Sequence, residues 1–189
     1  MGELVIRPAD SWSDLCEVFG PQGAYSGCWC MYFRVTNAEY RDLRGDGARE
    51  RMRELVESPG AAPGLLAYLG EAPVGWCTIA PRTEFVRLAG SRVAKPVDES
   101  EPVEGVWSVP CFYVTRAGRG RGAAAALLEA AVEFARSQGA RAVEGYPRDS
   151  EKKLPAAELF HGWKGLFEGA GFVEVARRTP TRPLMRLEL

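Results

Sequence analysis

Residues 106–132 read VWSVPCFYV, TRAGRGRG and AAAALLEAAV in succession, and this stretch decides the fold. Its β-branched and aromatic content predicts a strand over residues 106–114. Pro110 cannot donate a hydrogen bond to a neighbouring strand, so we expect a strand edge or a bulge there. The apolar spacing after residue 122 predicts a long helix, with Gly139 as its C-terminal cap. The stretch therefore predicts a strand, a tight basic loop and a helix, in that order.

The loop at residues 115–122 has the composition of an anion site. N–H groups in the first turn of a helix have no partner within the helix and lie at the positive end of its dipole. Glycine lets a phosphate approach this backbone closely, and Arg116, Arg119 and Arg121 add positive charge. We therefore expect a phosphate-bearing ligand at residues 115–124.

Other ligand-binding patterns fit this loop less well. Residues 120–125 also match the dinucleotide pattern G-x-G-x-x-A, but the chain ends too soon for the doubly wound sheet that must follow it. The sequence has no Gly-Lys-Ser/Thr of a Walker loop. An arginine-glycine tail that binds RNA conflicts with the ordered elements predicted on both sides. A basic surface turn without a ligand stays as the alternative.

The remaining elements are predicted from periodicity, caps and turn residues. Helices are expected over residues 12–19 with Ser11 as cap, over 38–43 with Asn37 as cap, and over 48–58. Strands are expected over residues 3–8, 65–69 and 73–80 (a hairpin), 142–146 and 183–189. Residues 91–104 are polar and predict a loop. This order predicts a mixed sheet with helices on both faces.

Composition indicates one compact domain over residues 1–189. Hydrophobic residues make up 46% of the chain and charged residues 26%, which is ordinary for a globular protein. The net charge of −1 gives no general attraction to nucleic acid or to an anionic membrane. No apolar stretch reaches the length of a membrane span. We therefore expect neither nucleic acid nor a membrane as a partner.

The cysteines are odd in number and scattered in position: Cys16, Cys28, Cys30, Cys77 and Cys111. This pattern argues against a disulfide framework and favours a reducing compartment. The first residues predict a strand and not a secretion signal, so we expect a cytoplasmic protein with free thiols. The single histidine, His161, leaves the cysteines without the partners of a zinc site, and no metal is expected.

The basic loop and the end of the chain together resemble the GCN5-related N-acetyltransferase (GNAT) superfamily. Residues 119–124, RGRGAA, fit the family pattern Gln/Arg-x-x-Gly-x-Gly/Ala. Residues 166–172, LFEGAGF, are similar to the family's closing helix and Gly-Phe turn. The similarity covers about residues 64–189. It implies an α/β fold with a mixed, mostly antiparallel twisted sheet and helices on both faces, the acyl-CoA N-acyltransferase arrangement.

The resemblance also implies acetyl-CoA as co-substrate, no metal, and transfer of the acetyl group to a primary amine. In the family the basic loop holds the pyrophosphate and the bulged strand holds the pantetheine arm. Carried over to this chain, the cofactor-binding residues are Phe112, Tyr113, Val114, Arg119, Gly120, Arg121, Gly122, Ala123 and Ala124. The acceptor, a small molecule or a protein amine, is expected beside aromatic and apolar side chains that are otherwise core residues: Tyr25, Trp29, Met31, Tyr32 and Trp107.

The chain departs from the family at the usual proton donor. Phe167 stands where the family has a tyrosine, and it has no proton to give. We therefore consider Tyr146 and Ser108 as catalytic residues, with His161 as a further candidate and direct protonation by solvent as the alternative. A backbone N–H freed by the bulge near Phe112 is expected to stabilise the negative charge on the thioester oxygen.

The same departure leaves a second function open. A protein that binds acyl-CoA without turnover, as a sensor or regulatory module, would keep the basic loop and need no proton donor. The residues also leave open the length of the acyl group and the choice between a monomer and a homodimer.

Overall fold

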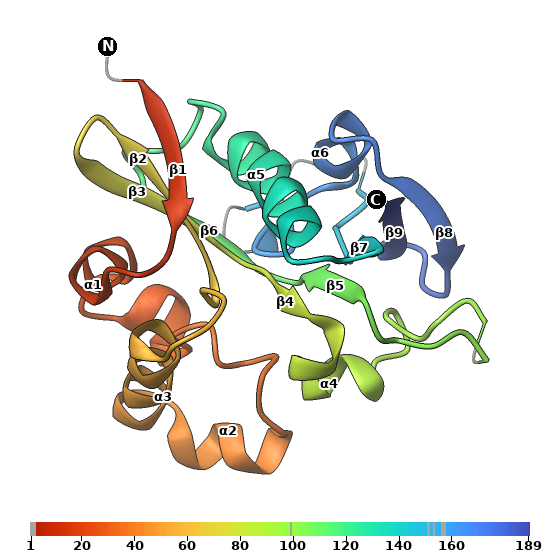
Figure 1. Cartoon of the computed structure of the whole chain (residues 1–189), viewed down its shortest axis with the longest axis horizontal. Helices are drawn as coiled ribbons and strands as arrows, with labels where there is room; N and C mark the ends of the chain where they lie inside the picture. The colour runs from red at the N-terminus through yellow and green to blue at the C-terminus, as the bar shows by residue number, and fades with distance from the viewer. Residues whose placement is uncertain (1–2, 99, 151, 153, 156–157) are drawn as a thin grey trace.

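The strand predicted over residues 106–114 is interrupted at Pro110 and Cys111, and its two parts belong to different sheets (Figure 1). The computed structural model describes residues 3–98, 100–150, 152, 154–155 and 158–189. Before the break, β5 (Val106–Val109) belongs to one sheet, and after it β6 (Phe112–Val114) belongs to the other. Pro110 has no N–H to donate, which interrupts strand pairing at this point.

The first sheet has the order β1-β2-β3-β6, and each neighbouring pair is antiparallel. It contains β1 (Leu4–Pro8), the hairpin of β2 (Gly64–Leu69) and β3 (Ala72–Thr78), and β6. Leu65 and Ala67 of β2 pack on one face, and Leu66 and Tyr68 pack on the other. This alternation follows from the two-residue period of a strand, and it buries both faces of the sheet.

The second sheet has the order β4-β5-β7-β9-β8. Its further strands are β4 (Ala80–Pro81), β7 (Ala142–Gly145), β8 (Val173–Arg177) and β9 (Pro183–Glu188). The pair of β5 and β7 is parallel, and the other pairs are antiparallel. The sheets are therefore mixed and mostly antiparallel, as the sequence predicts.

Helices cover both faces of the first sheet (Figure 1). The long helix α5 (Ala123–Ser137) packs on one face through its apolar stripe. On the other face lie α1 (Trp12–Phe19) and α3 (Asp46–Glu57). The shorter helices are α2 (Asn37–Leu43), α4 (Val86–Ala89) and α6 (Lys164–Gly169), with a π-helical turn η1 (Gly23–Gly27) and a 3-10 turn η2 (Arg82–Glu84).

Local capping explains where two of these helices begin. Ser11 accepts a hydrogen bond from the N–H of Asp14 and caps α1, as predicted. The expected cap at Asn37 is wrong by one residue. Thr36 is the cap of α2, because its hydroxyl accepts from the N–H of Glu39 while the Glu39 carboxylate accepts from the N–H of Thr36. This reciprocal pair satisfies two N–H groups at once.

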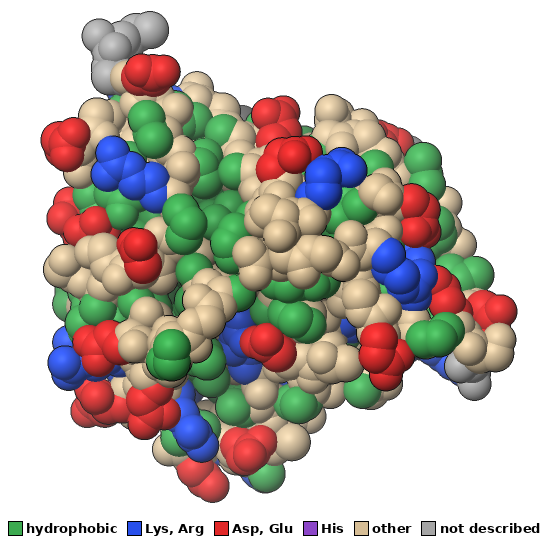
Figure 2. All heavy atoms as spheres, in the orientation of Figure 1, with side chains coloured by type: hydrophobic (Ala, Val, Ile, Leu, Met, Phe, Trp, Pro, Cys, Tyr) green, Lys and Arg blue, Asp and Glu red, His purple; other side chains and the backbone are tan. Residues whose placement is uncertain are grey.

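The surface carries charges of both signs. Figure 2 shows acidic and basic side chains interspersed over the face that it draws, in keeping with a net charge of −1. Within the part of the chain that the structure describes, no helix is both long enough and apolar enough to cross a bilayer.

The ring of Phe167 packs against the end of β7. Phe167 is fully buried, and a Cβ atom added at Gly145 would lie 2.0 Å from its Cε1 atom. The ring also makes edge contacts with Phe112 of β6, at 6.1 Å between centroids, and with Phe172, at 5.1 Å. Phe167 therefore joins the end of the second sheet to the first sheet beside the break.

Replacing Gly145 with alanine is expected to destabilise the protein by about 1–3 kcal/mol, because the added methyl group overlaps the Phe167 ring. Urea denaturation measures this loss. A second change, Phe167→Leu, should cost less in the Gly145→Ala background than in the wild type. The matched control is Gly169→Ala, whose Cβ meets nothing within 4 Å. Equal stability of Gly145→Ala and wild type would contradict the packing.

Candidate functional site

Two cavities meet beside the break between β5 and β6. The larger one, about 610 Å³, is called the loop cavity because residues of the basic loop line it. The smaller one, about 380 Å³, is called the aromatic cavity. The two share five lining residues, Ala24, Tyr25, Phe112, Tyr113 and Phe160. A molecule in one cavity therefore lies next to a molecule in the other.

The basic loop, where the sequence predicts an anion site, forms one wall of the loop cavity. Gly120 and Gly122 adopt φ angles of 70° and 79°, the left-handed region that glycine favours. Gly122 is the N-cap of α5, and it has no side chain to bind the first N–H groups of the helix. Ala123, Ala124 and Ala125 of this first turn line the cavity. The positive end of the α5 dipole therefore faces the cavity.

The arginines of the loop differ in position. Arg119 lines the loop cavity, and its Nε donates to the carbonyl of Val114 at 3.3 Å. Arg116 and Arg121 are exposed and line neither cavity. Gly118 serves packing, because a Cβ there would lie 2.8 Å from the carbonyl oxygen of Val74. The loop is thus seated on β3 with one cation directed along the cavity.

The main chain of β6 forms the second wall of the loop cavity. Tyr113 pairs with Trp76 of β3, so the polar groups of Phe112 and Val114 point away from β3. Phe112, Tyr113 and Val114 all line the cavity. The edge that carries the groups of Phe112 and Val114 is the one that an extended ligand arm would contact.

One N–H group near the bulge is already occupied in the structure. The bulge does not leave the N–H of Phe112 free, because it donates to the carbonyl of Phe160 at 2.6 Å. The segment from Leu159 to Gly162 lies across this edge and lines the loop cavity. The sequence indicates only the bulge, and a bulge does not determine which distant carbonyl accepts from the N–H of Phe112.

The aromatic cavity is walled mainly by ring side chains and thiols. Its aromatic residues are Tyr25, Tyr32, Phe33, Tyr40, Phe112, Tyr113 and Phe160, and its thiols are Cys28, Cys30 and Cys111. Of the described residues that line it, Arg44 alone carries a charge, and Arg44 Nε donates to the carbonyl of Ser26 at 2.6 Å. The cavity therefore offers an apolar environment with no carboxylate among its described lining residues.

The five predicted acceptor residues fall into two groups. Tyr25 and Tyr32 line the aromatic cavity and are exposed. Trp29, Met31 and Trp107 are buried in the hydrophobic core and line neither cavity. Trp29 is held there by edge and tilted contacts with Phe19 and Trp12, each at 5.6 Å between centroids. Phe33, Tyr40 and Phe160 line the cavity but carry no motif by which the sequence would single them out.

Ser108 and Tyr146, the predicted catalytic residues, meet in a buried polar network. Their hydroxyl oxygens are 2.9 Å apart. The Tyr146 hydroxyl donates to Glu144 at 3.2 Å and accepts from Arg82 at 3.1 Å. Neither Ser108 nor Tyr146 lines the loop cavity or the aromatic cavity. Burial and the nearby Glu144 charge raise the pKa of Tyr146.

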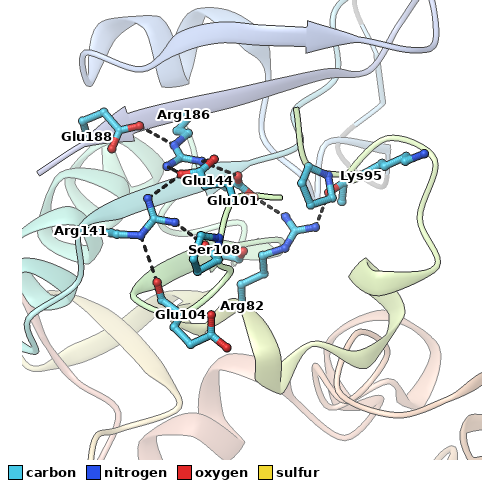
Figure 3. A network of polar contacts seen from close by, with 12 residues as sticks. Arg82, Lys95, Glu101, Glu104, Ser108, Arg141, Glu144, Arg186 and Glu188 are labelled. Carbon is cyan, nitrogen blue, oxygen red and sulfur yellow. Dashed lines mark hydrogen bonds and ion pairs between the residues drawn. The ribbon is translucent and has the colours of Figure 1, made fainter. Parts of the chain in front are cut away.

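This network fastens a loop to the second sheet. Glu144 pairs with Arg82 and, at 3.5 Å, with Arg186 of β9. Glu101 accepts from Arg186 at 2.7 Å and from Arg141 at 2.6 Å, and these bonds lower the pKa of Glu101 to about 2. Figure 3 shows these side chains converging from the loop and from the strands. The network thus holds the segment before β5 against β7 and β9.

His161 lies against the break itself. Its Nδ1 is 2.9 Å from the carbonyl oxygen of Pro110, which can only accept, so Nδ1 carries the proton of the neutral ring. The ring contacts Phe160 and Phe33, which line the aromatic cavity. Burial, and then the charge of Arg182, lower the pKa of His161 to about 3. His161 is therefore neutral at pH 7 and anchors the segment that carries Phe160.

No cluster of potential metal ligands of three or more members occurs among the described residues. The groups that the two cavities offer are main-chain N–H groups, arginine, rings and thiols. These suit an anionic ligand with an extended arm and a second, apolar ligand.

Comparison with known proteins identifies the family and the fold of the chain. The model of the Acetyltransferase (GNAT) family matches residues 29–161. A GCN5-related N-acetyltransferase from Kribbella flavida is 19% identical, with a TM-score of 0.55, and the match covers 98% of each chain. A GNAT-family protein from Desulfovibrio desulfuricans is 19% identical with a TM-score of 0.57, covering 98% of this chain and 99% of that one.

A third structure contains a ligand. It is yncA of Salmonella typhimurium with its cofactor acetyl-CoA, 16% identical with a TM-score of 0.52, and the match covers 98% of this chain and 94% of that one. No curated protein sequence matches this chain. At these identities the structural matches support the fold, and they confirm the α/β architecture predicted from the sequence.

The buried neutral state of His161 makes stability depend on pH. Below pH of about 6.5 the unfolded chain binds a proton at His161, while the folded chain stays neutral until about pH 3. Stability is therefore lost as the pH falls through this window, by about 2 kcal/mol between pH 7 and pH 5. Urea denaturation at the two pH values measures the loss. His161→Gln, which cannot titrate, should lose less, and an equal loss in the variant would contradict the assignment.

Proposed function

Because this chain belongs to the acetyltransferase (GNAT) family, we propose that it transfers an acetyl group from acetyl-CoA to a primary amine. The observation that carries the proposal is the junction of the two cavities at β6. One cavity has the groups that bind a pyrophosphate, and the other has walls that suit an apolar acceptor. Their shared residues lie where the two reactants would meet.

The loop and the edge of β6 divide the binding of acetyl-CoA between them. The pyrophosphate is held by residues 119–124, through the first-turn N–H groups of α5 and the Arg119 guanidinium. Arg121 is exposed and adds charge at the mouth of this site. The pantetheine arm runs along Phe112, Tyr113 and Val114, where the outward carbonyl of Phe112 and the outward N–H of Val114 supply hydrogen bonds. The bound acetyl-CoA supplies the thioester carbon that the amine attacks.

The aromatic cavity favours a neutral amine, the form that can attack. Transfer of an ammonium group from water into apolar surroundings disfavours its charge and lowers its pKa. The described lining residues include no carboxylate that would hold the ammonium form. Desolvation therefore does part of the work of a general base, and water that enters with the acceptor takes the proton. For the same reason we propose an acceptor with an apolar body rather than a polycation.

The leaving thiolate is protonated by solvent in this proposal. Phe167 has no proton to give and is buried between β7 and β6. Tyr146 has its only proton directed at Glu144, and its phenol borders neither cavity. Ser108 and Tyr146 then act on the site through the packing of β5 and β7 and not as proton donors.

A second candidate function is binding of acyl-CoA without turnover. One observation favours it. A backbone N–H near Phe112 is expected to stabilise the negative charge on the thioester oxygen, and the N–H of Phe112 itself already donates to the carbonyl of Phe160. Release of CoA thiol from acetyl-CoA, measured over a panel of apolar and polycationic amines, separates the two functions. Turnover with an apolar amine supports the transferase, and binding of acetyl-CoA without thiol release with any amine supports the sensor.

Gly122→Trp is expected to weaken acetyl-CoA binding by at least about tenfold, because the indole would fill the space where the pyrophosphate meets the first turn of α5. Isothermal calorimetry with acetyl-CoA measures the change. Gly122→Ala is the matched control, since it has the same strain at a φ of 79° without the bulk. Equal affinity of the tryptophan variant and the alanine variant would contradict the assignment.

Tyr146→Phe is expected to change kcat by less than about threefold, whereas loss of a general acid would cost about 10²–10⁴-fold. The same variant should lose about 1–3 kcal/mol of stability, because Ser108 and Arg82 lose a buried partner. The matched control is Tyr68→Phe, which removes a hydroxyl that donates to Asp14 at 2.8 Å and borders neither cavity. If the turnover rate falls by about 100-fold or more in Tyr146→Phe alone, Tyr146 is the proton donor and solvent is not.

A further inference from the structure

Three thiols gather on one wall of the aromatic cavity. Cys28 and Cys30 follow η1, and Cys111 lies in the break between β5 and β6. The sulfur atoms of Cys30 and Cys111 are 3.7 Å apart, although 81 residues separate them along the chain. The remaining two thiols lie elsewhere, Cys16 on α1 and Cys77 on β3. The fold has therefore brought one pair of distant cysteines into sulfur contact beside the acceptor site.

The backbone around Cys30 holds its thiol in this place. Trp29 and Cys30 have φ angles of 43° and 54°, in the left-handed region that residues other than glycine seldom adopt. The buried indole of Trp29 fixes this conformation from one side, where it lies directly against Gly23. From the other side, Trp76 Nε1 donates to the Cys30 sulfur at 3.0 Å. The Cys30 sulfur is thus directed at the break and not at the solvent.

We propose that Cys30 and Cys111 form a thiol-oxidation site, which a two-electron oxidant of thiols converts into a disulfide that disables the aromatic cavity. Formation of the disulfide is independent of the proposed function. Its effect on amine transfer rests on that function.

The two sulfur atoms differ in their exposure to solvent, and this difference determines which of them reacts first. Cys111 is half-buried and borders the cavity, so an oxidant such as diamide reaches it first. The Cys111 sulfur adds to one nitrogen of the N=N bond, and the other nitrogen takes the thiol proton. The buried Cys30 sulfur then attacks the Cys111 sulfur, the S–N bond breaks, and the hydrazine product leaves with the second proton. Two thiols are oxidised by two electrons, and one N=N bond is reduced.

The surroundings assist the second step and couple it to the cavity. A hydrogen bond with Cys111 and burial raise the pKa of Cys30, and the N–H of Trp76 opposes this rise by stabilising negative charge that develops on the Cys30 sulfur. Bond formation brings the sulfurs from 3.7 Å to about 2.05 Å. Cys111 is joined directly to Phe112, which lines both cavities. A displacement of about 1 Å near reacting groups can cost about 100-fold in rate.

The experiment maps the bond before it measures activity. The full chain is treated with diamide, its remaining thiols are alkylated, and its peptides are analysed by mass spectrometry without reduction. We expect a peptide pair that joins residue 30 to residue 111, and its loss after dithiothreitol. Cys30→Ser and Cys111→Ser should lack the pair. The matched control Cys16→Ser should form it as the wild type does.

The second measurement compares each protein with its own untreated form. Oxidised wild type and oxidised Cys16→Ser should lose about 10- to 100-fold in kcat/KM for the amine while the Kd of acetyl-CoA is unchanged. Cys111→Ser should keep its own activity after diamide.

Three results would overturn the proposal. Five alkylated cysteines after diamide, or a bond between Cys28 and Cys30, or a bond between two chains on a non-reducing gel, would exclude the site. A bond between residues 30 and 111 with unchanged kcat/KM would exclude the effect on the cavity. If the reduced protein shows no amine transfer, the proposed function fails, and peptide mapping still decides whether the site exists.

Discussion

The missing N–H of Pro110 is the constraint on which the site depends. A continuous strand over residues 106–114 would pair with neighbours on both sides and leave no free edge. Because the ladder stops at Pro110, β5 pairs with β7 in one sheet and β6 pairs with β3 in the other. The outward groups of Phe112 and Val114 are the result. The segment at residues 160–161 then covers the break, since Phe160 accepts from Phe112 and His161 donates to Pro110.

Two kinds of electrostatic environment lie on either side of this break. At the basic loop, N–H groups and the Arg119 guanidinium face a cavity and have room for an anion. On the other side, Glu144 is buried between Arg82 and Arg186. The hydrogen-bonded hydroxyl groups of Ser108 and Tyr146 belong to the same network. Buried charges are tolerated when each has a partner, and such a set orders structure more than it offers chemistry. Arginine therefore belongs to the proposed binding site on one side of the break and to a structural network on the other.

The sequence predicts well what depends on short-range physics. The strand, loop and α5, the Ser11 cap and the hairpin of β2 and β3 follow from residue types at fixed spacing, and the mixed α/β class is confirmed. Predictions fail or stay open where a distant contact decides. The cap of α2 is an exception, because Thr36 and Glu39 form a local reciprocal pair that the Thr-x-x-Glu pattern of the sequence indicates. The direction of Trp29 depends on a left-handed backbone, and the approach of Cys30 to Cys111 depends on the whole sheet.

Cys28 and His161 share one physical property, which is burial beside the break. Burial beside the break disfavours charge of either sign. A hydrogen bond to Cys30, and then burial, raise the pKa of Cys28, and burial lowers the pKa of His161. The thiols of Cys28 and Cys30, whose pKa values are both raised, therefore stay protonated at neutral pH. An amine that enters the same surroundings is pushed toward its neutral form by the same desolvation. The desolvation that keeps Cys28 and Cys30 protonated would therefore also favour the nucleophilic form of an amine, which supports the proposal of acyl transfer in a cavity whose described lining residues include no carboxylate.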